Sequence, residues 1–129
     1  MRLIDALQYR LPLAGVVSIL HRASGAIMLV LLPFVIWMFD ASVTSEISYD
    51  GFTAAFAVGL GVLPGWFIKL VVLALIWAYL HHFIAGVRHL WMDATHSVTK
   101  EFGRQSAVVT LVLSVLLTVL LGAKLFGLY

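Results

Sequence analysis

The chain has 129 residues, of which 63% are hydrophobic and only 11% are charged, and its mean hydropathy is +1.08. Soluble domains are about 45–50% apolar and about 25% charged. A chain this short still leaves roughly a third of its surface exposed after folding, so the composition excludes a water-soluble globular domain. The net charge of +2 comes from basic residues spread along the chain, so no nucleic-acid partner is expected. The lack of cysteine excludes disulfides, zinc–thiolate sites and iron–sulfur ligation.

Three long apolar runs predict three transmembrane helices, at about residues 13–39, 65–91 and 106–128. Each run reaches the roughly 20 residues that cross a bilayer core as a helix. Pro33 is expected to kink the first helix. In the acidic linker that follows, Asp50 is expected to cap a short interfacial helix whose Phe52 and Phe56 share one face. The expected fold is therefore an all-α membrane protein, with residues 1–129 forming a single transmembrane domain.

Small and weakly polar residues recur at steps of four along the third predicted helix. They are Thr110, Ser114, Thr118 and Gly122. In lipid, such a stripe marks close contact between helices. We therefore expect this face to pack against a neighbouring helix.

The basic residues predict the orientation of the chain in the membrane. Arg2 and Arg10 lie before the first helix, and the second connection is surrounded by Arg88, Lys100 and Arg104. The first connection has no basic residue. The positive-inside rule then places the N-terminus inside and the C-terminus outside. The first apolar run continues past signal-peptide length, so no removable signal is expected. The absence of an Arg- and Ser-rich leader favours the bacterial inner membrane.

Polar groups at membrane depth are costly, so each is a functional candidate. One cluster on the first helix comprises Ser18, His21, Arg22, Ser24 and Gly25, and all of these except Ser24 share a face at offsets 0, 3, 4 and 7 from Ser18. A second cluster shares a face at offsets 0, 4, 7 and 11: His82, Gly86, His89 and Asp93. These two faces are the candidate sites of the chain.

The depth of His82 suggests a haem site. It precedes Arg88 by six residues, which places it roughly 9 Å deeper in the membrane. An imidazole with Gly86 one turn away suits a flat macrocycle, and His is an axial ligand of b-type haems. Spacing alone leaves open that His82 is a packing residue, that the arginines are interfacial anchors, or that neighbouring His81, about 100° away around the helix, is the ligand instead. The haem propionates would meet basic residues near the interface: His21, Arg22, Arg88 and His89.

Both clusters fall within longer motifs. Residues 18–25 read S-x-x-H-R-x-S/T-G, and residues 82–93 read H-x-x-x-G-a-R-H-a-x-x-D, where a is aliphatic. Together with the three-helix layout, these motifs resemble the cytochrome b membrane-anchor subunits of succinate dehydrogenase, or complex II. The similarity extends over nearly the whole chain.

This resemblance implies a four-subunit succinate:quinone oxidoreductase. The partners would be a flavoprotein, an iron–sulfur subunit and a second small membrane anchor, and the cofactor would be haem b, with ubiquinone as substrate. It implies that His82 is the haem ligand on this chain, with the second ligand from the partner anchor, and that Ser18 and Arg22 bind quinone. The sequence itself leaves open a second ligand from this chain, either His21 or His89. The haem surroundings would be His21, Arg22, Gly86, Arg88 and His89, and the chain alone would hold no complete active site.

Three other functions are alternatives to this one. The same architecture suits the anchor of a fumarate reductase, which runs the reaction in reverse. A haem-free scaffold would need the helices but neither motif. A transport subunit would use the paired intramembrane charges, but the apolar spans carry no carboxylate for proton coupling.

Overall fold

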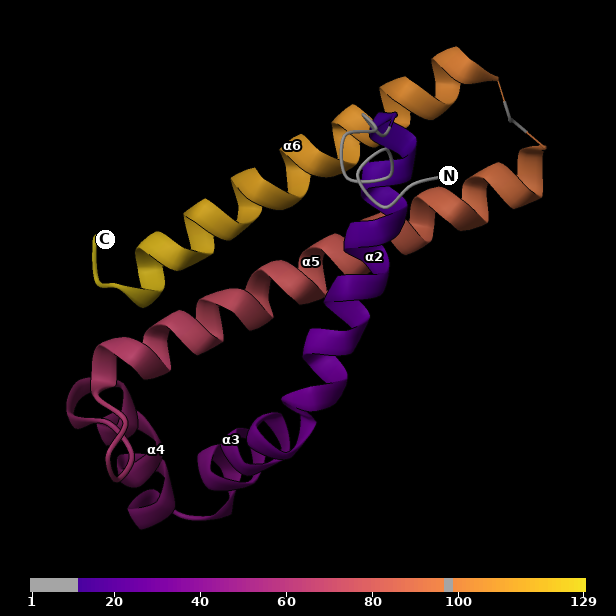
Figure 1. The fold of residues 1–129 in the computed structure, drawn as a ribbon. Helices are drawn as coiled ribbons and strands as arrows, with labels where there is room; N and C mark the ends of the chain where they lie inside the picture. The colour runs from indigo at the N-terminus through magenta and orange to yellow at the C-terminus, as the bar shows by residue number, and fades with distance from the viewer. Residues whose placement is uncertain (1–11, 97–98) are drawn as a thin grey trace, which may run out of the picture.

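The computed structural model describes residues 12–96 and 99–129, and their regular structure is entirely helical (Figure 1). The helices in chain order are α2 (Leu13–Val30), α3 (Leu32–Thr44), α4 (Glu46–Val58), α5 (Gly65–Thr95) and α6 (Lys100–Leu125). The expected all-α class is confirmed. Arg2 and Arg10, on which the orientation partly depends, lie outside the described residues, and the orientation stays a prediction.

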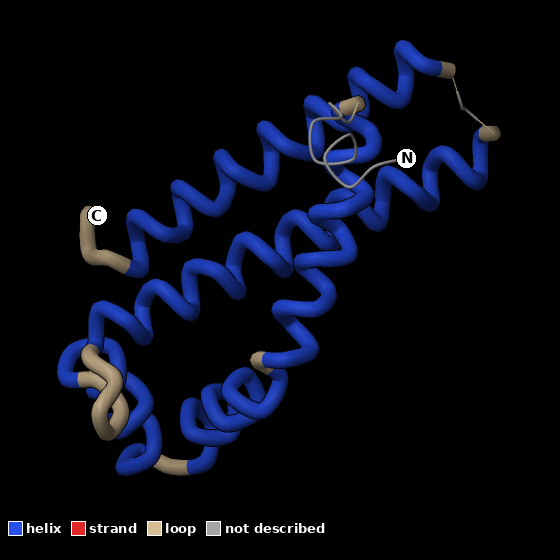
Figure 2. The backbone as a smooth tube through the Cα atoms, in the orientation of Figure 1, coloured by secondary structure: helices blue, strands red, loops and turns tan. Residues whose placement is uncertain are grey.

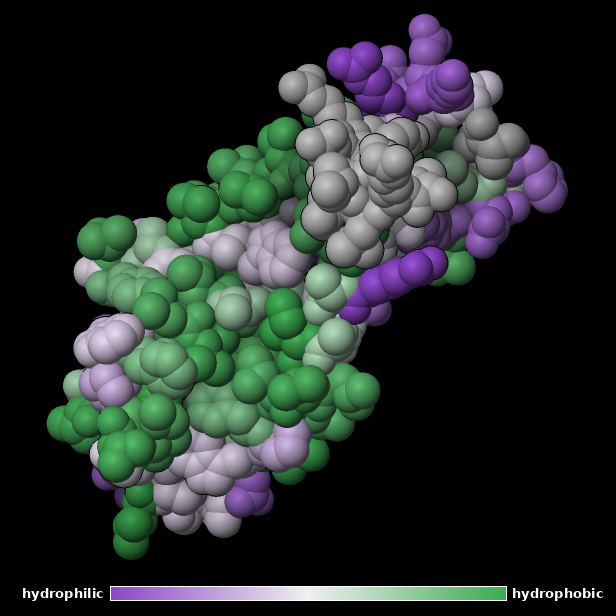
Figure 3. All heavy atoms as spheres, in the orientation of Figure 1, coloured by the Kyte–Doolittle hydropathy of each residue, from purple (hydrophilic) through white to green (hydrophobic). Residues whose placement is uncertain are grey.

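Helices α2, α5 and α6 are each long and apolar enough to cross a membrane. With 31 residues, α5 is about 46 Å long at 1.5 Å per residue, more than the roughly 30 Å of a bilayer core. It packs against both α2 and α6. Figure 3 shows hydrophobic side chains over most of the visible surface and hydrophilic ones gathered where α5 ends and α6 begins. The described part of the chain is thus a multi-pass membrane protein.

The first predicted helix, residues 13–39, is divided into two, so its prediction as one helix was wrong. Helix α2 ends at Val30, its C-cap Leu31 has φ −90° and ψ 5°, and Pro33 follows in the first turn of α3. Proline has no N–H to donate and its ring crowds the preceding turn, so the expected kink becomes a break, visible as a short loop in Figure 2. Helix α3 then continues past residue 39 to Thr44.

The other two spans differ from prediction mainly at the connection between them. Helix α5 runs to Thr95 rather than residue 91. Helix α6 begins at Lys100 rather than residue 106, because the side chain of Thr99 accepts a hydrogen bond from the Phe102 N–H at 3.2 Å and so caps the helix. It ends at Leu125 rather than residue 128. Capping by a single hydroxyl thus lengthens the helix beyond its apolar run.

The expected short helix in the first connection exists as α4, with its aromatic face as predicted. The rings of Phe52 and Phe56 lie 5.3 Å apart. The N-cap is Ser45 rather than Asp50: Ser45 and Ser48 bond each other's backbone N–H groups in a capping box. The capping prediction for Asp50 was therefore wrong, because a better-placed hydroxyl lies five residues earlier.

Small side chains allow α2, α5 and α6 to approach closely. Val17, Ala85 and Ala107, one from each helix, are fully buried against one another. The stripe predicted on α6 faces this interior, with Ser114 fully buried. Near the other end of α6, a Cβ atom on Gly122 would come within 2.6 Å of a Leu73 methyl group on α5. The predicted contact between helices is confirmed at both positions.

Candidate functional site

Three histidines from α2 and α5 meet where the two helices pack; we call His21, His82 and His89 the histidine cluster. The rings of His21 and His82 stack with centroids 4.1 Å apart and planes 12° apart. His89 meets the His21 ring edge-on at 5.4 Å. Because His82 and His89 are seven residues apart, they share one side of α5. The structure therefore brings the two sequence motifs together in space.

A buried serine links the two stacked histidines. The Ser24 side chain is 0% exposed, and its Oγ donates a hydrogen bond to the His21 carbonyl oxygen at 2.7 Å. The same Oγ lies 3.2 Å from Nδ1 of His82, and this Nδ1 is 3.1 Å from the His21 carbonyl. The sequence places Ser24 in the first motif, but it gives no sign that this hydroxyl reaches His82.

Two glycines leave room for the rings. A Cβ atom on Gly25 would lie 3.2 Å from Cε1 of His82, tighter than most side-chain contacts. A Cβ on Gly86 would lie 3.8 Å from Nε2 of His21, an ordinary van der Waals distance. The His82 ring is therefore held between α2 and its own helix with little spare space on the side of Gly25.

Ser18 and Arg22 occupy the side of α2 that their spacing predicts, one turn apart. Ser18 is half-buried and Arg22 is exposed. Within residues 12–96 and 99–129, neither side chain makes a hydrogen bond, and no carboxylate pairs with Arg22. Both polar groups are thus available to an external ligand.

His81 lies on a different side of α5 from the histidine cluster. It is 0% exposed, its ring stacks on Trp77 at 5.1 Å, and its Nδ1 is 3.4 Å from Ser114 Oγ on α6. The backbone of Val17 also interacts with it, yet its Nε2 has no partner with hydrogen-bonding geometry in the part of the chain that is described. The neighbouring histidines therefore point into separate environments.

Arg88 shares the side of α5 that carries His81. It is 7% exposed; its Nε donates to Ser106 Oγ at 2.8 Å and its Nη2 donates to the Gly103 carbonyl at 3.2 Å. Both partners belong to α6. The structure brings the environment candidates His21 and His89 together with the predicted ligand His82. The contacts of Arg88 run to α6 instead, and its predicted role toward haem stays a prediction. The hydroxyl of Ser106, one turn before the predicted small-residue stripe, was the sequence signal for this contact.

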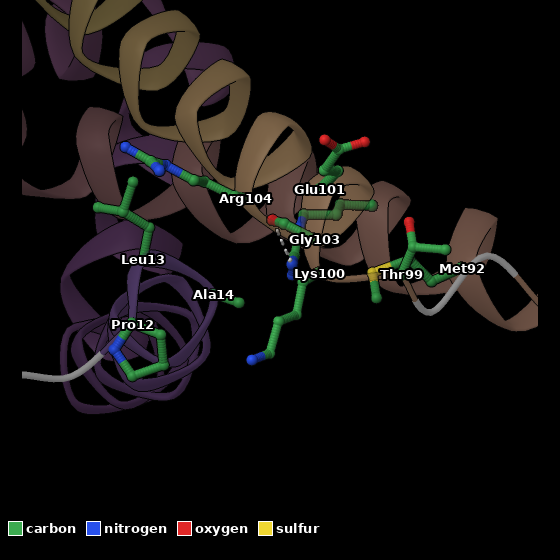
Figure 4. Close-up of a pocket in the computed structure, with 10 residues that line it drawn as sticks. Pro12, Leu13, Ala14, Met92, Thr99, Lys100, Glu101, Gly103 and Arg104 are labelled. Carbon is green, nitrogen blue, oxygen red and sulfur yellow. Dashed lines mark hydrogen bonds between the residues drawn. The ribbon is translucent and has the colours of Figure 1, made fainter.

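A cavity of about 820 Å³ lies beside Arg88, apart from the histidine cluster. Its walls come from the start of α2, the end of α5 and the start of α6, and include Lys100, Glu101 and Arg104. Figure 4 shows the hydrogen bond that ends on the Gly103 carbonyl at this wall. Basic groups thus outnumber acidic ones at this end of the bundle.

Among residues 12–96 and 99–129, no three or more His, Asp or Glu side chains are placed to hold a metal ion by themselves. A cofactor that takes only one ligand from this chain does not need such a set of side chains. The histidine cluster offers ring nitrogens at the junction of two spanning helices.

These features define the class of the protein: a small multi-pass membrane subunit with a histidine cluster between two of its spans. The family model described as succinate dehydrogenase/fumarate reductase transmembrane subunit matches residues 4–121, and the chain belongs to this family. The resemblance drawn from the two motifs is therefore confirmed.

Two curated relatives carry the name succinate dehydrogenase cytochrome b556 subunit. The protein from Paracoccus denitrificans is 33% identical over 112 residues, which cover 87% of this chain and 81% of the relative. The protein from Coxiella burnetii is 31% identical over 119 residues, which cover 92% of this chain and 90% of the relative. The similarity thus extends over most of both relatives.

Proposed function

We propose that this chain is the membrane-anchor cytochrome b subunit of a succinate:quinone oxidoreductase. His82 supplies one axial ligand to haem b, and ubiquinone binds beside Ser18 and Arg22 and is reduced to quinol. The observation that carries the proposal is the histidine cluster, in which two motifs from separate spans meet around His82. The relatives' printed names, which include cytochrome b556, support the choice of haem b.

The residues present fit a haem ligated by His82. Its Nδ1 is occupied by the Ser24 and His21 contacts, and no hydrogen bond of its Nε2 is found within residues 12–96 and 99–129. Metal-ligating histidines usually bond through one ring nitrogen to a nearby acceptor, which orients the other toward the metal. The ring is half-buried rather than enclosed, so a group shared with a partner anchor can reach it.

Basic side chains around the cluster suit the propionates of such a haem. His21 and His89 belong to the cluster itself, and Arg22 is the residue that follows His21 on α2. Gly86 keeps the backbone of α5 open beside the rings. When bound, haem b would supply a one-electron redox centre, and this chain's part is to hold and orient it.

The quinone assignment depends on Ser18 and Arg22, polar groups that have no hydrogen-bond partner within residues 12–96 and 99–129. The Ser18 hydroxyl can donate to a quinone carbonyl oxygen, and the Arg22 guanidinium can stabilise negative charge as electrons arrive at that oxygen. A preorganised donor at a developing charge is typically worth about 10²–10³ in rate. Their spacing of one helical turn allows both to reach one ring.

The assembly we propose includes a second small anchor, an iron–sulfur subunit and a flavoprotein in the bacterial inner membrane. The bacterial sources of the relatives support this location. The basic end of the bundle, near the cavity lined by Lys100 and Arg104, would face the soluble subunits. Exposed apolar side chains along α2 and α5, such as Leu29 and Phe83, leave surface for the second anchor and for lipid.

The test is a reduced-minus-oxidised optical spectrum of membranes that contain the assembled complex. We expect a low-spin b-type signal in the wild type, its loss in His82→Gly, and its return when imidazole is added to His82→Gly. His81→Gly is the matched control, because it removes the adjacent imidazole, and it should keep the signal. Immunoblots of the membranes give the amount of chain inserted in each variant.

An unchanged low-spin spectrum in His82→Gly would overturn the ligand assignment. A wild-type complex with no haem signal would overturn haem binding and would favour the scaffold function. Loss in His81→Gly with retention in His82→Gly would assign the iron to the neighbouring histidine instead.

A fumarate reductase anchor is the second candidate, because the family description covers both enzymes. The two functions differ in direction and in the quinone used. Comparing succinate oxidation by ubiquinone with fumarate reduction by menaquinol in the same membranes distinguishes them. We expect the first rate to exceed the second.

A further inference from the structure

Each of the two adjacent histidines on α5 faces one buried serine from another helix. Ser24 on α2 lies 3.2 Å from His82 Nδ1, and Ser114 on α6 lies 3.4 Å from His81 Nδ1. Both serines are 0% exposed. The chain therefore contains a matched pair, in which the same two residue types meet beside the proposed iron site and one residue away from it.

The surroundings of His82 fix the position of its ring proton. A carbonyl oxygen has no proton to give, so the His21 carbonyl, 3.1 Å from Nδ1, accepts a hydrogen bond. The Ser24 hydroxyl gives its only proton to the same carbonyl at 2.7 Å, so toward Nδ1 it can only accept. Two acceptors face Nδ1, and a neutral His82 must therefore carry its proton there.

With the proton on Nδ1, the lone pair of the ring is on Nε2. We infer that Ser24, together with the His21 carbonyl, is the positioning residue that fixes the tautomer and orientation of His82 and tunes the haem potential. The inference rests on the proposed function, because it assigns a role to Ser24 only if His82 ligates the iron. Ser24 itself does not touch the reacting groups.

Burial makes the contact effective. The Ser24 side chain is closed to solvent, so its contact with Nδ1 lies in a low-dielectric environment, where a hydrogen bond is electrostatically stronger than in water. Acceptors on the distal N–H raise the basicity of a histidine ligand, which stabilises the oxidised metal and lowers its potential. Because Ser24 belongs to α2 and His82 to α5, the packing of two helices is coupled to the ligand.

The test compares three variants in the assembled complex by redox titration of the haem and by low-temperature electron paramagnetic resonance. Ser24→Ala should raise the midpoint potential and change the low-spin g values, because one acceptor at Nδ1 is lost. Ser24→Thr keeps a hydroxyl and should stay near the wild type. Ser114→Ala removes an equally buried serine from His81 and should leave the potential and g values unchanged.

The outcomes separate the inference from the function beneath it. Wild-type potential and g values in Ser24→Ala with haem bound would overturn the inference, as would an equal shift in Ser114→Ala. Loss of haem from Ser24→Ala alone supports it, and loss from all three variants would overturn it, since a general packing effect would then suffice. A wild-type complex without haem would instead refute the proposed function.

Discussion

The two sides of α5 differ although their residues are similar. Toward α2, His82 stacks on His21 at 4.1 Å and is half-buried. Toward α6, His81 is fully buried beside Ser114. Seven residues further along α5, Arg88 donates hydrogen bonds to the Ser106 hydroxyl and the Gly103 carbonyl. The first side leaves an imidazole half-exposed, and the second uses its polar groups to hold two helices together.

The difference follows from helix geometry. Consecutive residues are rotated by about 100° around an α-helix, so adjacent histidines cannot share one site. Residues seven apart lie nearly in line, which places His81 with Arg88 and His82 with His89. A polar residue in a membrane helix is therefore interpreted from the helix it faces, and its residue type alone does not distinguish a site from a packing contact.

The largest effect is expected from Arg22→Ala, on the side of the proposed site. Loss of a preorganised cation at the quinone oxygen should lower succinate–quinone activity about 10²- to 10³-fold. Ser18→Ala removes a neutral hydrogen bond of about 1 kcal/mol and should cost roughly fivefold. Succinate oxidation with a soluble dye serves as the control and should persist in both variants. Equal loss of the two activities would mean defective assembly and would leave no specific role for Arg22.

Arg88→Leu tests the other side of the comparison. It removes two hydrogen bonds from a charged donor, each worth about 1.5–3 kcal/mol before packing compensates, so we expect roughly 2–4 kcal/mol of destabilisation. The measurement is unfolding of the purified complex at increasing concentrations of a denaturing detergent. Arg22→Leu is the matched control, and its free energy of unfolding should change little. A normal unfolding curve with loss of haem would contradict the packing role and place Arg88 in the haem environment.

Gly25→Ala should have a smaller effect than Arg22→Ala or Arg88→Leu. Its Cβ would lie 3.2 Å from His82 Cε1, so the ring must move by a few tenths of an ångström, and overpacking of this kind costs about 1 kcal/mol or more. We expect roughly fivefold weaker haem retention, measured by dilution of the purified complex. Gly103→Ala on α6, where no atom lies within 4 Å of the added Cβ, should retain haem normally. Equal retention in both variants would show that the ring has room to move.

The sequence determined the class, the number of spanning helices and the two motifs, because apolar length and residue spacing within one helix are local properties. It also predicted which residues of each motif share a face, and His21, His82 and His89 meet as those faces require. Helix ends were predicted less well. Pro33 divides the first span, and the Ser45 and Thr99 caps set boundaries that hydropathy does not record.

Tertiary structure alone decided which helix each polar face meets. The contact of Ser24 with His82 joins residues 58 positions apart, and that of His81 with Ser114 joins residues 33 apart. Such distances in sequence leave no periodic trace. Hydrogen bonds across helices depend on the rotation and depth of both partners, which are fixed only when small residues such as Ala85 and Ala107 let the helices pack.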